Sequence, residues 1–212
     1  MPSAPLAPAL ASGFGPGHVP DPALAAAIEL AASVEGWLAR EEIALLIELA
    51  AGVPASRAIV EVGNYRGRST VALALGALRG ARAQVVSIDP HVEFVGPRGG
   101  LFGHEDQACL YANLTRTGVG AQVSVVGLDS RAVARGWSGP ALGLLFLDGD
   151  HRYESVRADF EAWRPHLAPH ALLAFDDCDF PDVARLVGEL EYAGHLVARS
   201  AAGKVRAFEL AD

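Results

Sequence analysis

The sequence has few cysteines and no cluster of basic residues, and both absences exclude classes of protein. Two cysteines in 212 residues, Cys109 and Cys178, are too few for a disulfide framework or a cysteine-based zinc site. The formal net charge is -8 and no segment concentrates lysine and arginine, so the positive surface that binds a phosphate backbone is missing. We therefore expect no nucleic-acid partner.

Long apolar runs are also absent, since no apolar stretch approaches the length needed to cross a bilayer. Residues 1–20 are rich in proline, alanine and glycine and contain no lysine or arginine, so they lack the charged start of a secretory signal. We expect a cytoplasmic protein without a membrane partner, in which residues 1–20 form a flexible arm.

What the sequence does contain is a hydrophobic fraction of 51% and a regular alternation of apolar runs with helical segments. The apolar runs predict strands near 58–62, 84–88, 122–127, 142–147, 171–175, 195–199 and 204–209. The helical patterns predict helices near 21–34, 40–51, 67–79, 104–117, 152–163 and 181–193.

This alternation predicts an α/β fold with a doubly wound, seven-stranded sheet that is mostly parallel and has helices on both faces. The last two strands are separated only by a short break, SAAGK, and should form a C-terminal antiparallel hairpin. We expect residues 21–212 to form a single domain, with residues 21–55 as its helical lead-in.

The loop after the first predicted strand, in IVEVGNYRGRST, is the first candidate for a ligand site, because doubly wound sheets bind ligands beyond the carboxyl ends of their strands. Gly63 and Gly67 permit unusual backbone angles and a close approach to a ligand. The dinucleotide motif G-x-G-x-x-G and the lysine of a P-loop are absent. Asp89, at the tip of the second strand, can accept hydrogen bonds from both hydroxyls of a ribose. Together these features favour a nucleoside ligand.

Two later predicted strands end in acidic residues. LLFLDGDHRY places Asp148 directly after an apolar run, and HALLAFDDC ends in Asp176 and Asp177. A right-handed crossover would set these strands side by side, so that the three carboxylates lie close together and need a cation among them. Oxygen ligands suit Mg²⁺, Mn²⁺ or Ca²⁺ better than zinc. The alternative is that Asp177 and Asp179 cap the following helix while Asp176 is solvated.

His151 lies three residues after Asp148, at the predicted start of a helix. An unperturbed histidine titrates at a pH of about 6.5, which suits a general base. A helix N-terminus disfavours the protonated form of the imidazole. The alternative is an ordinary polar residue at the surface.

Taken together, these residues resemble the class I S-adenosylmethionine-dependent methyltransferases, and among them the small metal-assisted O-methyltransferases. The resemblance covers residues from about 35 to 200 and rests on IVEVGNYRGRSTVALA, VVSIDPH and, most specifically, LLFLDGDHRYESVRADFEAWRPHLAPHALLAFDDC. The last of these segments is especially similar to the group that contains macrolide sugar O-methyltransferases and a cephalosporin-pathway enzyme.

The resemblance implies a Rossmann-like fold, with S-adenosyl-L-methionine (SAM) and Mg²⁺ or another divalent cation as cofactors. It implies that Asp148, Asp176 and Asp177 hold the metal. His151, which stands where catechol-type relatives have a lysine base, and Asp148 would be the catalytic residues. The residues that it implies for the cofactor are Glu61, Gly63, Asn64, Tyr65, Gly67, Ser69, Asp89, Asp129, Ser130 and Asp148.

The expected activity is the transfer of a methyl group to a hydroxyl of a small molecule, such as a natural product or a catechol- or diol-like acceptor. Residues 91–107 would form a flap over the acceptor, with Phe94, Arg98 and Phe102 facing it. The alternatives are an NAD-dependent oxidoreductase on the same sheet, a catalytically silent cofactor-binding protein and a hydroxylase-pathway protein. The apolar N-terminal helices would also be compatible with a homodimer.

Overall fold

The computed structural model describes residues 21–95 and 100–211, so the arm expected at 1–20 and the expected flap residue Arg98 lie outside the described residues. The chain begins with two helices, α1 (Pro22–Ala32) and α2 (Arg40–Ala51). Asp21 starts α1 because its Oδ1 accepts the N–H groups of Ala23 and Leu24, each at 2.9 Å. Among the described residues, no helix has the length and apolar character that a membrane crossing requires.

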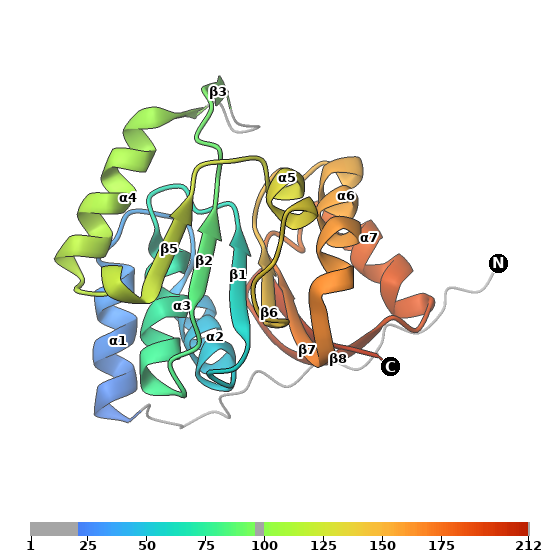
Figure 1. The fold of residues 1–212 in the computed structure, drawn as a ribbon, viewed down its shortest axis with the longest axis horizontal. Helices are drawn as coiled ribbons and strands as arrows, with labels where there is room; N and C mark the ends of the chain where they lie inside the picture. The colour runs from blue at the N-terminus through green and yellow to red at the C-terminus, as the bar shows by residue number, and fades with distance from the viewer. Residues whose placement is uncertain (1–20, 96–99, 212) are drawn as a thin grey trace.

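The predicted seven-stranded sheet is confirmed. Its strands run in the order β5-β2-β1-β6-β7-β9-β8, and all are parallel except β9, which pairs antiparallel with both neighbours. The chain moves outward from β1 through β2 to β5 and then returns to the other side of β1 with β6, so the strand order reverses between β1 and β6 (Figure 1). The strands are β1 (Ala58–Val62), β2 (Val85–Ile88), β5 (Val123–Val126), β6 (Leu142–Leu147), β7 (Leu167–Phe175), β8 (Leu196–Ala202) and β9 (Val205–Leu210).

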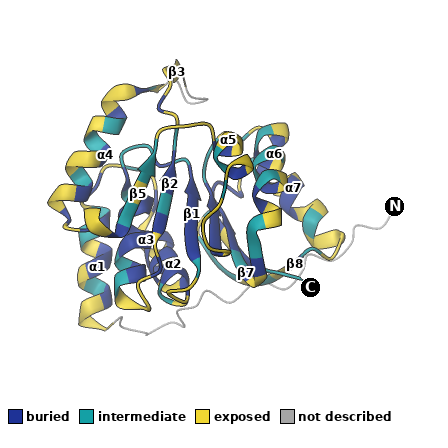
Figure 2. Cartoon of the chain, in the orientation of Figure 1, coloured by how far each residue is buried: buried dark blue, intermediate teal, exposed yellow. Residues whose placement is uncertain are grey.

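Helices cover both faces of the sheet, and each face has its own core (Figure 1). Successive strand residues alternate between the two cores: Ile59 and Leu144 belong to one, and Val60 and Leu145 to the other. The sheet is therefore buried on both sides, while the outer faces of the helices are exposed (Figure 2). Beside α1 and α2, the first face carries α3 (Arg68–Arg79) and α4 (His104–Arg116); the second carries α5 (Ser130–Arg135), α6 (Tyr153–Trp163) and α7 (Pro181–Tyr192).

Several short elements were not predicted. The helix α5 is too short to show a helical period in the sequence, and the hairpin strands β3 (Phe94–Val95) and β4 (Leu101–Phe102) have only two residues each. Short 3-10 turns also occur at Gly120–Gln122 and Arg164–His166.

Strand β7 begins at Leu167, before its predicted start at residue 171. Pro169 and His170, which suggest a turn in the sequence, instead lie in a bulge where the register with β6 shifts. His170 adopts a left-handed φ of 58° there, so the strand continues past it.

Candidate active site

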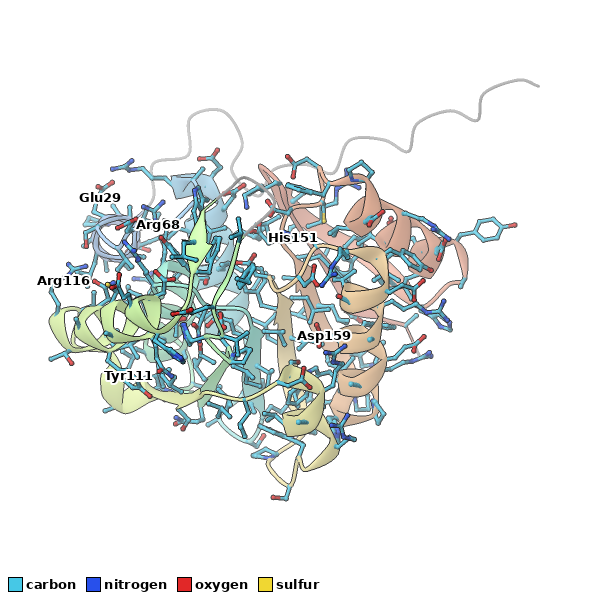
Figure 3. All side chains as sticks on the ribbon, turned by 90° about the horizontal axis from the view of Figure 1, so that it is seen from above. Glu29, Arg68, Tyr111, Arg116, His151 and Asp159 are labelled. Carbon is cyan, nitrogen blue, oxygen red and sulfur yellow. The ribbon has the colours of Figure 1, made fainter. Side chains whose placement is uncertain are left out.

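The carboxyl ends of β1 and β6 touch at the point where the strand order reverses. Gly63, directly after β1, has a φ of 84°, and a Cβ atom on it would lie 2.1 Å from the carbonyl oxygen of Asp148. The N–H of Asp148 in turn donates to the carbonyl oxygen of Val62 at 2.8 Å. Only glycine allows this approach, which joins the loop after β1 to the start of the predicted metal cluster. Figure 3 looks onto this edge of the sheet, with His151 labelled near its middle.

Asp89, the predicted ribose ligand, ties the loop after β1 to the end of β2. Its Oδ2 accepts the backbone N–H groups of Asn64 at 3.1 Å and Tyr65 at 3.4 Å, and its Oδ1 accepts the N–H of His91 at 2.9 Å. A carboxylate offers about four acceptor positions, so these three bonds leave capacity for a further donor. The side chain is half-buried at the surface of the loop.

Glu61, also predicted to bind the cofactor, lies beneath the loop and has no exposed surface. Its Oε2 accepts hydrogen bonds from Thr70 Oγ1 at 2.6 Å and Ser87 Oγ at 2.7 Å, and Asn64 Nδ2 donates to the same Ser87 oxygen at 2.7 Å. Burial raises the pKa of Glu61 to about 7, although hydrogen bonds from Ser69, Thr70 and Ser87 oppose the shift. Glu61, Asn64 and Ser69 are thus all buried, and they support the loop from below.

Gly67 lies at the start of α3 and packs against α4. It caps α3 with a left-handed φ of 92°, and a Cβ atom on it would lie 2.5 Å from Leu110 Cδ1 of α4. The missing side chain therefore leaves room for Leu110. The neighbouring Arg66 fixes the loop further, since its Nε donates to the buried Asp106 at 2.8 Å and its Nη1 to Glu35 at 2.5 Å.

Aromatic rings link this loop to the hairpin formed by β3 and β4. The ring of Tyr65 lies 4.6 Å from that of Trp37 and 5.3 Å from that of Phe102, and Phe102 stacks on Phe94 at 4.9 Å. Phe94 and Phe102, predicted to face the acceptor, thus contact each other and the loop. The Trp37 and Phe94 side chains remain about half exposed.

Asp148, His151 and Asp177 form a compact group after β6 and β7. His151 Nε2 lies 3.0 Å from Asp177 Oδ2 and 3.8 Å from Asp148 Oδ1, and one ligand atom of each residue lies within 4.8 Å of the others. The helix α7 is not capped by any side chain, so Asp177 does not serve as the cap that the alternative required. Its backbone has a left-handed φ of 48°, a conformation that for a non-glycine residue is often found at functional sites.

The pKa values of this group are strongly shifted. Burial and the charge of Asp176 raise the pKa of Asp148 well above its usual value. Burial alone would lower the pKa of His151, but the contacts with Asp148 and Asp177 raise it to about 10. The two carboxylates therefore favour the protonated form of His151, opposite to the effect of a helix N-terminus. Burial would raise the pKa of Asp177, but His151 and Lys204 lower it to about 2.

Asp176 is buried and not solvated, with 4% of its surface exposed. Its Oδ2 accepts a hydrogen bond from Lys204 Nζ at 2.5 Å, and its Oδ1 is buried without a hydrogen-bond partner. The same Nζ donates to Asp177 Oδ1 at 2.7 Å. Sequence reasoning missed Lys204, although it is the only lysine in the chain. The structure therefore brings Asp148 and Asp177 together with His151, and Lys204 links Asp176 to Asp177.

A family model described as a methyltransferase domain matches residues 60–178, more than half of the chain. The chain belongs to this family of methyltransferases. The matched segment runs from β1 to just past β7, so it contains both the loop after β1 and the carboxylate group of this methyltransferase.

Solved structures share the fold of this methyltransferase. Cofactor-bound Rv0187 from MTB is 22% identical, with 90% of each chain covered and a TM-score of 0.62. CalS11, a TDP-rhamnose 3'-O-methyltransferase of calicheamicin biosynthesis, is 24% identical over 80% of this chain and 78% of its own, with a TM-score of 0.58. TomG from Streptomyces achromogenes, an O-methyltransferase of tomaymycin synthesis solved with SAM, is 19% identical over 91% and 92%, with a TM-score of 0.61.

The remaining predicted cofactor residues of the methyltransferase lie at the start of α5. Asp129 caps this helix, since its Oδ1 accepts the N–H of Ala132 at 3.0 Å, and its Oδ2 pairs with Arg131 at 2.9 Å. Ser130 is buried, and its Oγ accepts a hydrogen bond from Trp163 Nε1 at 2.8 Å. Asp129 is therefore the one of the two with an exposed side chain.

Proposed function

We propose that this methyltransferase moves the methyl group of SAM to a hydroxyl of a small molecule, with the help of a divalent metal ion. The observation that carries the proposal is the contact between Gly63 and Asp148, which joins the loop after β1 to the group of carboxylates after β6 and β7. A methyl donor held at the first would lie beside a hydroxyl held at the second.

The assignment of SAM is supported by the family and by the chemistry of the loop. TomG, which shares the fold, was solved with SAM. The acceptor capacity left on Asp89 suits a ribose hydroxyl, and the exposed carboxylate of Asp129 suits a further donor from the nucleoside. The family match favours methyl transfer over the NAD-dependent oxidoreductase considered from the sequence.

The donor set fits a hard divalent ion. Asp148 and Asp177 supply carboxylate oxygens that lie within 4.8 Å of each other, and the Oδ1 of the adjacent Asp176 is buried without a hydrogen-bond partner. Burial and the negative charge of Asp176 raise the pKa of Asp148, so a cation bound beside Asp148 would stabilise its charged form. When bound, such an ion would lower the pKa of an acceptor hydroxyl and fix its position.

His151 is the proposed general base. In the reaction the acceptor oxygen forms a bond to the methyl carbon, the sulfonium sulfur keeps the electrons of the broken C–S bond, and the hydroxyl proton passes to the imidazole. With a pKa of about 10 the imidazole is already protonated at neutral pH. The imidazole can accept a proton only when a positive charge nearby offsets the negative charges of Asp148 and Asp177. The proposed base and the proposed ion therefore depend on the same two carboxylates.

The acceptor is proposed to be a sugar-like diol or a catechol-like hydroxyl of a natural product. CalS11 acts on TDP-rhamnose, and TomG belongs to tomaymycin synthesis. Adjacent hydroxyls are suited to share one divalent ion. The aromatic rings of Trp37, Tyr65 and Phe102 give the side of the loop an apolar surface for such a molecule.

Calorimetry with S-adenosylhomocysteine (SAH), with and without Mg²⁺, tests the cofactor and the ion together. We expect SAH to bind, and methyl transfer to a panel of sugar, catechol and phenol acceptors to stop in EDTA and return with Mg²⁺. Asp148→Asn should abolish turnover, whereas the control Asp150→Asn, an exposed residue paired with Arg152, should not. A lack of SAH binding contradicts the cofactor assignment, and full turnover in EDTA contradicts only the role of the ion.

A further inference from the structure

Lys204 is a single positive charge placed on two of the carboxylates proposed to hold the ion. Its Nζ lies 2.5 Å from Asp176 Oδ2 and 2.7 Å from Asp177 Oδ1, and 20% of its side chain is exposed. No other lysine exists in the chain. The contact is therefore specific to this residue and this pair of aspartates.

The fold holds Lys204 in place through its backbone. Its N–H donates to Oε1 of the buried Glu42 in α2 at 2.8 Å, and its carbonyl oxygen accepts the N–H of Cys178 at 2.9 Å. The preceding Gly203, in the turn between β8 and β9, has a φ of 52°, and a Cβ atom on it would lie 2.2 Å from the same Glu42 oxygen. These contacts hold the backbone of Lys204 at a point from which its ammonium reaches both aspartates.

The ammonium uses only part of what the two aspartates offer. It takes one oxygen from each, and it leaves Asp176 Oδ1 buried without a partner and Asp177 Oδ2 facing His151. Asp177 lies in the group with Asp148 that would hold the ion, and the unpartnered Oδ1 belongs to the adjacent Asp176. A divalent ion at those oxygens would lie within a few ångströms of the ammonium, and the two positive charges would repel each other.

We propose that Lys204 is a resident cation of this site, which stabilises Asp176 and Asp177 when no divalent ion is bound and weakens the binding of that ion. The inference rests on the metal site of the proposed function. The ammonium of Lys204 makes the protein stable without the ion, and it makes the ion readily exchangeable. Removing the lysine should reverse both properties.

The test compares the full-length wild type with Lys204→Met, which keeps the apolar stem of the side chain and removes the charge. Calorimetry should show that Lys204→Met binds Mg²⁺ at least about tenfold more tightly than the wild type. Without the ion the variant should melt at a lower temperature, and Mg²⁺ should raise its melting temperature by more than it raises that of the wild type. If the lysine had only a structural role, its replacement would lower the melting temperature equally with and without Mg²⁺.

The matched control is Arg199→Gln, which removes an exposed cation from the same hairpin. Arg199 pairs with Glu209 and not with the aspartates. It should bind Mg²⁺ like the wild type. Equal or weaker binding of Mg²⁺ by Lys204→Met overturns the inference and leaves the metal site standing. If neither the wild type nor Lys204→Met binds Mg²⁺, the inference and the metal site both fall.

A measurement on the wild type covers the case in which Lys204→Met does not fold. Protein labelled with ¹⁵N-lysine contains one labelled ammonium group, because the sequence has one lysine. Saturation with Mg²⁺ should shift its resonance, since the ion and the ammonium share the same carboxylates. A resonance that stays unchanged while calorimetry records Mg²⁺ binding overturns the inference.

Discussion

At the scale of single residues, the same burial has opposite consequences for two groups in this site. Glu61 has hydroxyl donors but no cation beside it, so burial dominates and raises its pKa to about 7. Asp177 is also buried, but His151 and Lys204 are close enough to outweigh burial and lower its pKa to about 2. A sequence cannot distinguish these cases, because the partners that decide the pKa come from distant segments.

The raised pKa of Glu61 predicts a pH dependence of stability. The folded protein holds the proton more tightly than the unfolded chain, so the contribution of Glu61 is fully present below its unfolded pKa near 4.5 and is lost as the pH rises through about 7. Glu61→Gln removes this dependence. Relative to that variant, the wild type should lose up to about 3 kcal/mol of unfolding free energy between about pH 5 and pH 8. Urea unfolding of both proteins at the two pH values measures the difference, and parallel pH profiles would contradict the prediction.

His151 offers a second prediction at this scale. His151→Ala should lower kcat for methyl transfer by roughly 100-fold or more, because a general base typically contributes that much. Binding of SAH should remain within about twofold, since the imidazole contacts Asp148 and Asp177 and not the loop after β1. His166→Ala, at the opposite end of the parallel strands just before β7, is the control and should retain activity. Loss of SAH binding together with kcat would show that His151 acts on the cofactor and not as the base.

At the scale of elements, the long helices and strands follow from the sequence because each has a period long enough to recognise. Leu142–Leu147 and Arg40–Ala51 lie where they are predicted. Elements set by tertiary contacts are missed, such as the six-residue helix α5 and the two-residue strands of β3 and β4. The glycines of the loop after β1 are recognisable, but what lies against them is not. Gly67 meets Leu110 from α4, and nothing in the sequence near Gly67 indicates that contact.

The packing of α2 against α3 gives a prediction at this scale. A Cβ atom on Gly76 of α3 would lie 2.3 Å from the carbonyl oxygen of Ile47 and 2.8 Å from Ala50 Cβ, both in α2. Gly76→Ala should therefore force the helices apart and lower the unfolding free energy by about 2 kcal/mol or more.

Gly188 in α7 is the matched control, because among the described residues a Cβ on it would meet nothing within 4 Å beyond its chain neighbours and the backbone of its own helix. Gly188→Ala should raise stability by roughly 0.5 to 1 kcal/mol, since alanine restricts the unfolded chain and favours a helix. Urea unfolding of the two variants checks the opposite signs. Equal stability of Gly76→Ala and the wild type would mean that the helices separate without cost.

At the scale of the whole molecule, the candidate site depends on contacts between the two ends of the chain. The order of the motifs predicts that Asp148, Asp176 and Asp177 meet, since parallel strands bring their carboxyl ends to one edge. The arrival of Lys204 could not be predicted in the same way. Its position depends on the hairpin returning beside β7 and on Glu42, a residue of the second helix. A single lysine in an acidic chain was the only signal available.

Glu42 is therefore expected to stabilise the hairpin of β8 and β9 as well as its own helix. Its buried carboxylate accepts the N–H of Ala39 at 2.6 Å, which closes the start of α2, and the N–H of Lys204 at 2.8 Å. Glu42→Ala leaves both donors without their partner and should lower the unfolding free energy by roughly 3 kcal/mol. Glu41→Ala removes an exposed acid from the same first turn, so it controls for the interaction with the helix dipole. It should lower the unfolding free energy by only about 0.3 to 1 kcal/mol.

Hydrogen exchange of the single lysine amide separates a local from a global effect of Glu42→Ala. We expect the amide of Lys204 to exchange faster than the loss of global stability alone would require, because its acceptor is gone. If Glu42→Ala and Glu41→Ala unfold at the same urea concentration, the contact between α2 and the hairpin contributes little. The second helix would then not control the position of the cation at the carboxyl ends of β6 and β7.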